Sequence, residues 1–530
     1  RNTLIFRSSF FGKRNALHYL AWLSDADKKK LMPKKLNIPL ALLVLGIITS
    51  LALHKSLLGD EIRGWHSWRQ AQSMCNIRNF ERHDANIMNP RLSRFNSGEG
   101  NIFRYEFPIM QWSIGMVHKV VGSHIAVARI CVFLMGLLAV FGFYRLLLLL
   151  DVGPGLAALG AGLFLFSPLL HTYIVSPVPD VLALAGGVWY LYGTLAYQRT
   201  PKWSWLLLSG AALCLATAAK LPFLMFSVVS IYFFFRSIIQ TKGLSKHNLR
   251  LAVVQFAMVV PALAWYAWVI PTWGENPVLK GIFAADADWE NIRKILLFYL
   301  DTMLPSFVLN SILVAPFIVG FFHRQGGVNI HAWVYPMAAI TIIYVVLQCT
   351  ALSIEHDYYF LPFVPWMYVM VTLGLQVIGR RLPRYVAWAG SIVLAVSVVV
   401  VSHNQVAFKW RLEHSGYNPS LFTHQSELKA AVPDGSLCVI LNDPSYSQFG
   451  YMVDKMGYFF YNDYLPATWI HDMIENKDVL YMYSDSRVVD EHPEVKPLLD
   501  TMLLEAGTIR VFRFKPRQKQ EVSGMEQGGK

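Results

Sequence analysis

The sequence predicts a polytopic α-helical membrane protein with about eleven spans and a C-terminal extracytoplasmic α/β domain. Of the 530 residues, 54% are hydrophobic and 15% are charged, whereas soluble domains carry about 25% charged residues. Apolar segments of membrane-spanning length recur from residue 36 to residue 403. From residue 404 onward the composition is polar and rich in turn residues. These observations divide the chain into 1–35, 36–403 and 404–530.

Residues 1–35 lack the continuous apolar core that defines a secretory signal. Apolar residues between Phe10 and Leu23 fall on one helical face, and Lys13 and Arg14 fall on the opposite face. We expect a cytoplasmic segment here, either an amphipathic helix at the membrane interface or a loosely ordered basic tail.

Eleven apolar segments are candidates for crossing a bilayer, which takes about 20 residues. They are 36–58, 124–149, 154–174, 178–198, 203–219, 221–236, 250–271, 296–321, 331–352, 358–378 and 384–403. The run 203–235 is too long for one crossing, and Pro222 divides it into two short spans. No internal repeat is apparent.

The distribution of basic residues predicts the orientation of the spans. If the amphipathic stretch 107–122 does not cross, the short segments on one side hold most of the Lys and Arg residues. The opposite short segments hold only Lys220, Lys280, Arg293 and Lys294. We therefore expect a multi-pass protein of the cytoplasmic (inner) membrane, with 107–122 as a surface helix on the periplasmic side. The net charge of +13 reflects this flanking pattern and does not indicate a nucleic-acid partner.

The C-terminal segment shows the alternating pattern of a small α/β domain on the outer face. The predicted strands are Leu437–Leu441, Val479–Tyr483 and Thr508–Phe514. The predicted helices are Ser447–Met456, Pro466–Glu475 and Glu494–Leu504. The tail beyond about Lys515 is expected to be disordered.

Span parity brings polar residues from distant parts of the chain to the outer interface, above all from the first outer loop, 59–123. Because an ionisable residue at membrane depth costs about 2.5–3.5 kcal/mol, several at one level indicate a site. The carboxylates are Asp60, Glu61, Glu106 and Asp180; the cations and phenols are Lys220, Arg69, His356, Tyr358 and Tyr359; the other rings are Trp65, His66, Trp68 and Tyr105. Each also has a structural interpretation, as a solvated helix end, a helix cap, a snorkelling lysine or an aromatic belt.

Several motifs resemble those of GT-C membrane glycosyltransferases, in the group of protein O-mannosyltransferases and the aminoarabinose transferase of lipid A. The resemblance covers residues 36–403 and includes an acidic first loop. Its motifs are Trp65 to Gln70, Tyr105-Glu106-Phe107-Pro108, Ser176-Pro177-Val178-Pro179-Asp180, Lys220-Leu221-Pro222 and His356-Asp357-Tyr358-Tyr359-Phe360-Leu361-Pro362. The chain departs from a bacterial subgroup at Gln72, where an acid is expected.

The resemblance implies transfer of a sugar, with inversion, from a polyprenyl-phosphate donor such as undecaprenyl phosphate. The acceptor would be a lipid, a polysaccharide or a protein at the outer face of the cell envelope. Physical chemistry supports the same site, because a lipid phosphate presents an anion at headgroup depth. Lys220, Arg69 and a protonated His356 are suited to bind it and to stabilise the departing phosphate, with Tyr358 and Tyr359 alongside.

A carboxylate would accept the proton of the acceptor hydroxyl. We expect Glu106 or Asp60 to be this base, with Glu61 beside Asp60 and with Asp180 positioning the sugar or acceptor. The rings of Trp65, Trp68 and Tyr105 are expected to stack on sugars, with His66 nearby. No cofactor is required, and a divalent metal at Glu106 stays an option that no ligand spacing demands.

Other classes of function stay open. A transporter or lipid flippase would predict discontinuous helices, an internal repeat and a site near mid-bilayer. A non-catalytic scaffold that displays the C-terminal domain would leave the loop chemistry unexplained. Within the enzyme class, a ligase that moves whole oligosaccharides from a pyrophosphate lipid is a near neighbour.

Overall fold

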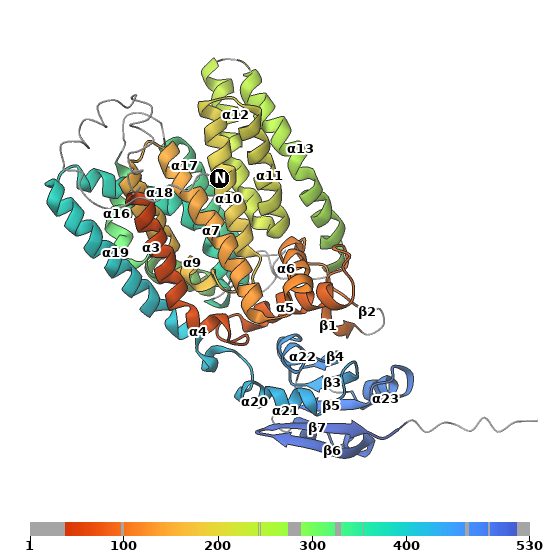
Figure 1. Cartoon of the computed structure of the whole chain (residues 1–530). Helices are drawn as coiled ribbons and strands as arrows, with labels where there is room; N and C mark the ends of the chain where they lie inside the picture. Colours follow the sequence, from red (N-terminus) through yellow and green to blue (C-terminus); the bar gives the residue numbers. More distant parts are fainter. Residues whose placement is uncertain are drawn as a thin grey trace, which may run out of the picture.

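The computed structural model describes residues 38–516 except 97–99, 242, 244, 274–287, 324–329, 353, 462–465 and 486–487. The predicted segment 1–35 and almost all of the predicted tail beyond Lys515 lie outside these residues. A bundle of long helices faces a smaller domain of strands and short helices, and the first loop lies between the two (Figure 1). We call the end of the bundle that faces this smaller domain the domain end.

The helices of the bundle follow the predicted apolar segments. The first half comprises α3 (Ile38–Leu53), α4 (Lys55–Leu58), α7 (Ile125–Leu149), α8 (Pro154–Leu165), α9 (Pro168–Tyr173), α10 (Asp180–Arg199) and α11 (Trp203–Ala219). The second half comprises η1 (Leu221–Ser227), α12 (Val228–Thr241), α13 (Lys246–Val269), η2 (Ile270–Trp273), α15 (Trp289–Phe298), η4 (Tyr299–Val308), η5 (Ser311–Leu313), α16 (Val314–Phe322), α17 (His331–Leu352), η6 (Ile354–Phe363), α18 (Val364–Gly379) and α19 (Arg384–Ala407).

Among the described residues, six helices are long and apolar enough to cross a bilayer. A pair bent by 99°, Trp289–Val308 with Ser311–Phe322, makes seven if it is one span. Three shorter apolar helices are α3, α8 and α11. Each of the eleven predicted segments contains a helix, and the number of actual spans stays a prediction.

Small residues allow the central helices to pack closely. Helix α10 is almost wholly buried and packs against α7 and α11. A Cβ at Gly186 would lie 2.8 Å from the carbonyl oxygen of Ala212, so α10 and α11 pack almost backbone to backbone. Helices α16 and α18 cross still more closely, because a Cβ at Gly320 would lie 1.9 Å from the carbonyl oxygen of Met370.

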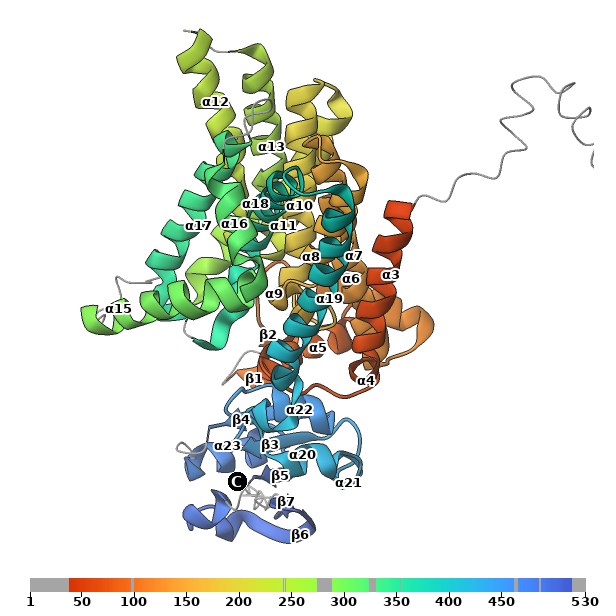
Figure 2. The same ribbon diagram turned by 90° about the vertical axis from the view of Figure 1, so that its left-hand side faces the viewer.

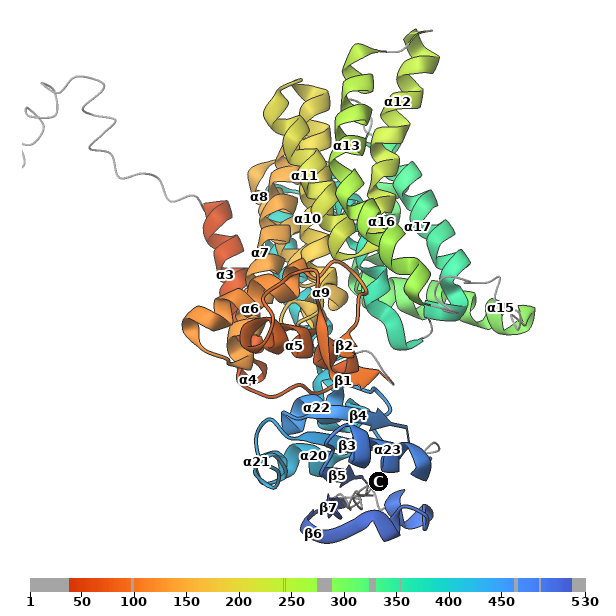
Figure 3. The same cartoon turned by 90° about the vertical axis from the view of Figure 1, so that its right-hand side faces the viewer.

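The first loop folds into α5 (Ser67–Arg82), a hairpin of β1 (Arg91–Asn96) and β2 (Gly100–Ile102), and α6 (Ile109–Val121). Helix α6 corresponds to the predicted amphipathic helix 107–122, and it packs against α5. Figures 2 and 3 show α5 between the bundle and the C-terminal domain, and Figure 3 shows α6 beside it. The hairpin is not foreseen by the sequence pattern.

The C-terminal domain is a seven-stranded sheet in the order β2-β1-β4-β3-β5-β7-β6. Its own strands are β3 (Leu437–Leu441), β4 (Met456–Phe460), β5 (Tyr481–Ser484), β6 (Leu499–Ala506) and β7 (Ile509–Phe514). Its helices are η7 (Phe408–Trp410), η8 (Leu412–His414), α20 (Pro419–Thr423), α21 (Gln425–Ala430), α22 (Gln448–Val453), α23 (Ala467–Asn476), η9 (Val488–Glu491) and η10 (Lys496–Leu498). Strand β1 pairs in parallel with β4, so the first loop and this domain share one sheet.

The three predicted strands and the predicted helices at 447–456 and 466–475 are confirmed in their main parts. The predicted helix Glu494–Leu504 is wrong, because most of it is η10 followed by β6. Strand β6 pairs with β7 across a tight turn at Gly507, where φ is +61°. This hairpin pairing overrides the helical preference of the Leu, Met and Glu residues in the segment.

Candidate functional site

Four charged side chains from distant parts of the chain gather at the domain end of the bundle. Arg69 lies in the first turn of α5, and Glu106 lies in the segment before α6. Asp180 is the first residue of α10, and Lys220 follows the last residue of α11. Because α10 and α11 are consecutive, closely packed helices, the start of one lies beside the end of the other.

Asp180 and Lys220 form a buried ion pair with a loose geometry. Nζ of Lys220 lies 3.7 Å from Oδ2 of Asp180, and the two residues are 8% and 1% exposed. Neither carboxylate oxygen of Asp180 has a hydrogen-bond partner among the described residues. The Lys220 ammonium also lies over the rings of Tyr358 and Tyr359, at 5.3 Å and 4.9 Å from their centroids. This carboxylate is therefore neutralised by a cation but free to accept a proton.

Arg69 and Glu106 form a second buried pair beside the first. Arg69 donates to Glu106, and Nε2 of Gln111 donates to the same carboxylate at 3.1 Å. Burial alone would raise the pKa of Glu106, but Arg69 and Lys220 outweigh it and hold the pKa below its usual range. Nη1 of Arg69 donates to Oε1 of Gln72 at 2.9 Å. The expected acid at Gln72 is thus replaced by a neutral acceptor that helps to orient the guanidinium.

Backbone hydrogen bonds hold the Glu106 segment against the bundle. The amide of Phe107 donates to the carbonyl of Ala218 at 3.1 Å, close to the end of α11. The indole of Trp265 donates to the carbonyl of Tyr105 at 3.0 Å. These contacts place Glu106 next to Lys220 without the help of its own side chain.

A third buried group is centred on Asp357, which lies in η6 beside the predicted His356. Its carboxylate accepts hydrogen bonds from Nε2 of His66 at 3.2 Å and from the Tyr173 hydroxyl, and it pairs with the Lys409 ammonium. The Asp357 and Lys409 side chains are 0% and 1% exposed. The group joins the first loop, the bundle and η7, the first helix of the C-terminal domain.

The predicted aromatic residues divide between two environments. His66 lies 5.0 Å from Tyr358 between ring centroids, and Trp68 lies 5.7 Å from His356, so these four rings pack together on the side of Tyr358, whose ring lies under the Lys220 ammonium. Trp65 instead lies under the Lys409 ammonium at 5.0 Å and packs on Phe408. The ring of Tyr105 faces Trp273 at 6.4 Å.

The structure does not bring Asp60 and Glu61 into the cluster. Asp60 pairs with Nη2 of Arg63 at 2.6 Å, and Glu61 lies 3.5 Å from the Tyr451 hydroxyl. Nη2 of Arg129 donates to the carbonyl oxygens of both residues at 3.3 Å. These acids therefore connect the first loop to α7 and to the C-terminal domain, apart from Asp180.

The surroundings of Glu106 do not suit a divalent metal. Among the described residues, no group of three His, Cys, Asp or Glu side chains is arranged to hold a metal ion. Glu106 is flanked by the cations Arg69 and Lys220, which would repel a metal ion. The donor set around Glu106 thus fits an anion better than a metal.

Three of the buried residues, Lys409, Tyr173 and Asp357, were not among the predicted site residues. Lys409 follows the last apolar segment, and Tyr173 lies within a predicted span. Nothing local in the sequence distinguishes either of them. Asp357 stands inside the His356 to Pro362 motif, and that motif was the only signal available for it.

Comparisons with known proteins concern the fold of the chain. The family model described as dolichyl-phosphate-mannose-protein mannosyltransferase matches residues 106–265. No curated protein sequence matches the chain. The crystal structure of ArnT from Cupriavidus metallidurans bound to undecaprenyl phosphate is similar, with a TM-score of 0.61, 13% identity, and coverage of 90% of this chain and 99% of that chain. The apo structure of the same protein gives a TM-score of 0.60 with the same identity and coverage.

An oligosaccharyltransferase is also similar in fold. The Archaeoglobus fulgidus oligosaccharyltransferase in complex with zinc and sulfate has a TM-score of 0.52 and 15% identity, and the match covers 84% of this chain and 68% of that chain. At these identities the likeness concerns the fold alone.

Proposed function

Because the chain has the fold of GT-C membrane proteins, we propose that it is a membrane glycosyltransferase that uses a polyprenyl-phosphate sugar donor. The acceptor is a lipid, a glycan or a protein at the outer face of the membrane. The observation that carries the proposal is the buried Asp180 carboxylate, which has a cation beside it and no hydrogen-bond donor on either oxygen among the described residues.

Lys220 and Arg69 are the groups we assign to the donor phosphate. Both are buried cations at one end of a helix bundle, and Tyr358 and Tyr359 lie under the Lys220 ammonium. When the bond between the sugar and the phosphate breaks, negative charge builds on the leaving phosphate. Fixed cations stabilise that charge more in a buried site than in water.

Asp180 is the group we assign as general base. The sequence alone favoured Glu106 or Asp60, with Asp180 in a positioning role. Glu106, however, already accepts hydrogen bonds from Arg69 and Gln111, and Asp60 lies with Arg63. Asp180 is the member of the cluster that can accept the proton of an attacking hydroxyl without losing an existing hydrogen bond.

Glu106 then serves to hold Arg69, and no step of the reaction is assigned to a metal. The rings of His66, Trp68 and His356 pack together beside Tyr358, and we assign them to contacts with sugars. A single displacement by the acceptor hydroxyl on the anomeric carbon inverts its configuration. The C–O bond to the phosphate breaks, the new glycosidic bond forms, and the proton passes to Asp180.

A transporter or lipid flippase is the second candidate. One feature favours it, because the helix pair bent by 99° is the kind of discontinuous element that transporters use. The charged cluster lies at one end of the bundle, however, and a flippase needs access from both membrane faces.

One assay separates the two candidates. Purified protein in lipid vesicles is supplied with polyprenyl-phosphate monosaccharides labelled in the sugar, together with a membrane extract as a source of acceptor. A glycosyltransferase releases polyprenyl phosphate and moves the label to another molecule. A flippase moves the labelled lipid between leaflets unchanged. Recovery of intact donor with every sugar tested would contradict the proposed function.

A further inference from the structure

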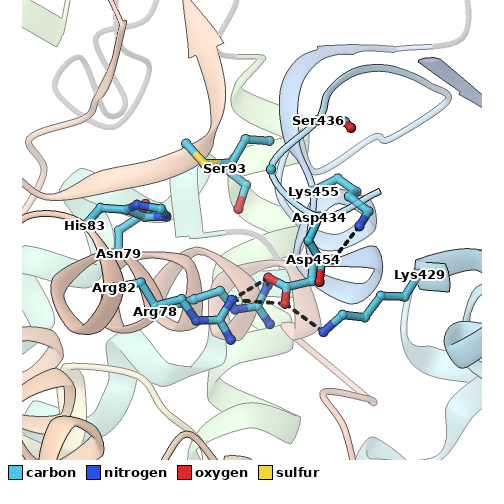
Figure 4. A pocket seen from close by; sticks show the side chains of 12 residues that line it. Arg78, Asn79, Arg82, His83, Ser93, Lys429, Asp434, Ser436, Asp454 and Lys455 are labelled. Carbon is cyan, nitrogen blue, oxygen red and sulfur yellow. Dashed lines mark hydrogen bonds and ion pairs between the residues drawn. The ribbon is translucent and has the colours of Figure 1, made fainter. Parts of the chain in front are cut away.

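We propose that a polar groove between α5 and the C-terminal domain binds an anionic group, phosphate or carboxylate, of an extended saccharide acceptor. The groove has a volume of about 350 Å³ and is lined by residues of both walls (Figure 4). Its charged lining consists of Arg78, Arg82, Lys429, Lys455, Asp434 and Asp454. The inference rests on the proposed function, since it concerns the acceptor of that reaction.

Positive charge exceeds negative charge along this groove, with four cationic side chains against two carboxylates. One carboxylate, that of Asp454, is shared by three cations: Arg78 at 2.7 Å, Arg82 at 2.9 Å and Lys429 at 2.8 Å. A single carboxylate cannot neutralise three cations, so the wall retains net positive charge. Guanidinium and ammonium groups arranged in this way are suited to a phosphate or carboxylate.

The cations are held in place before any ligand arrives. Arg78 donates to the carbonyl of Tyr451 at 2.9 Å and lies over its ring at 4.3 Å. The Lys455 side chain is 0% exposed and reaches Asp434 at 2.9 Å. Side chains that are already ordered lose little entropy on binding. The side chains of Arg82 and Lys429 are 40% and 45% exposed, so a ligand can reach them from solvent.

The two walls of the groove keep a fixed separation because they belong to one folded unit. Strand β1, which follows α5 in the chain, pairs with β4 of the C-terminal domain through Arg94 and Gly457. Met456, the first residue of β4, lines the groove. The shared sheet therefore sets the position of the domain wall relative to α5.

Helix α5 also fixes the distance between this groove and the donor site. It carries Arg69 in its first turn and Arg78 and Arg82 in its second half. At a rise of about 1.5 Å per residue, Arg78 lies about 14 Å and Arg82 about 20 Å further along the axis than Arg69. A molecule that reaches both places must be several sugar units long. This spacing favours an acidic oligosaccharide or glycolipid headgroup over a single sugar.

The test uses the full-length protein in detergent and three probes: maltotetraose 1-phosphate, tetragalacturonate and neutral maltotetraose. Binding is measured by saturation-transfer NMR titration for wild type and for the double variant Arg82→Gln/Lys429→Gln. Neither residue belongs to the donor site. Arg513→Gln serves as the matched control, because Arg513 forms an exposed ion pair with Asp500 elsewhere in the same domain.

We expect wild type and Arg513→Gln to bind at least one anionic probe more tightly than maltotetraose. The double variant should bind that probe about tenfold more weakly, because it loses two charge-assisted contacts. The choice between the phosphate and carboxylate probes identifies the anion. Equal binding by wild type and the double variant, or an equal loss in Arg513→Gln, would overturn the groove as a specific site, as would no binding by wild type.

Measuring the binding of polyprenyl phosphate distinguishes a failure of this inference from a failure of the proposed function on which it rests. The double variant should bind polyprenyl phosphate as wild type does, which also shows that it is folded. If the groove binds anions but no donor sugar is consumed under any condition, the proposed function fails and the anion site remains.

Discussion

Nζ of Lys220 lies 3.7 Å from Oδ2 of Asp180, although the two residues are separated by a pair of antiparallel helices. At this distance the cation stabilises the carboxylate without donating a close hydrogen bond to it. Both oxygens of Asp180 remain without partners among the described residues. A substrate that enters between the two side chains can therefore meet a phosphate-binding cation and a proton acceptor together.

Replacing Asp180 with Asn should abolish most turnover while leaving donor binding intact. The amide keeps the size of the side chain but cannot accept the proton, and loss of a general base lowers turnover by about 100-fold to 10,000-fold. The measurement is donor consumption at saturating donor. Asp151→Asn is the control, because Asp151 pairs with Arg199 at the opposite end of α10. Unchanged turnover in Asp180→Asn would remove Asp180 from the chemistry.

Replacing Lys220 with Met should weaken donor binding. One charge-assisted hydrogen bond contributes about 1.5–3 kcal/mol, which corresponds to roughly 10-fold to 100-fold in the dissociation constant of polyprenyl phosphate. The matched control is Lys202→Met, since Lys202 stands at the other end of α11. An equal effect of the two substitutions would show that the loss does not come from a specific phosphate site.

Replacing Lys409 with Met should destabilise the protein more than it changes the chemistry. The substitution leaves the Asp357 carboxylate buried without its cation, and breaking a buried pair typically costs about 3–5 kcal/mol. Thermal unfolding of the purified protein measures the effect. The double variant Asp357→Asn/Lys409→Met should recover part of the loss, because the unpaired charge is gone. Arg513→Gln, at an exposed pair, should change stability by less than about 1 kcal/mol.

The stability of the C-terminal domain should depend on pH through Asp443. Burial raises the pKa of this carboxyl to about 6, against opposing hydrogen bonds from Ser445 and the amide of Phe449. A raised folded pKa favours the folded state below the unfolded pKa, and this contribution is lost as pH rises through the folded value. Across both pKa values, from about pH 3 to about pH 7, the loss approaches about 3 kcal/mol, at about 1.4 kcal/mol per pKa unit.

Thermal melting of full-length wild type and Asp443→Asn at pH 4, 5, 6 and 7 checks this effect. The Asn side chain stays neutral, so the variant should gain stability relative to wild type as the pH rises. A constant difference between the two proteins across this range would show that Asp443 does not titrate in the folded domain.

Local sequence patterns were sufficient to predict most of the bundle and part of the C-terminal domain. A helix occurs in every predicted apolar segment, and strands β3, β5 and β7 lie where alternation placed them. Strand β6 was missed because its residues favour a helix in isolation and become a strand only by pairing with β7. The pairing of β1 with β4 joins segments more than 350 residues apart, and no local pattern contains it.

In the candidate site, too, sequence motifs indicated individual residues but not the contacts that depend on tertiary structure. Polar motifs at the ends of apolar segments identified Arg69, Glu106, Asp180 and Lys220, and the fold brings them together. The motifs could not show that Asp60 and Glu61 face α7 and the C-terminal domain. Both residues precede Arg69 by only a few positions in the same loop, so the sequence places all three at the same interface. Lys409 pairs with Asp357 across 52 residues of chain, a contact that depends wholly on tertiary structure.

The most direct measurement places the donor lipid on the protein. A polyprenyl phosphate that carries a photoactivatable diazirine in the isoprene unit next to the phosphate is bound to the purified protein and illuminated, and the labelled peptides are identified by mass spectrometry. We expect labelling at the start of α5, around Lys220 and in η6, with less labelling in Lys220→Met. Labelling concentrated near Asp151 and Lys202, at the far end of α10 and α11, would contradict a donor site formed by Asp180 and Lys220.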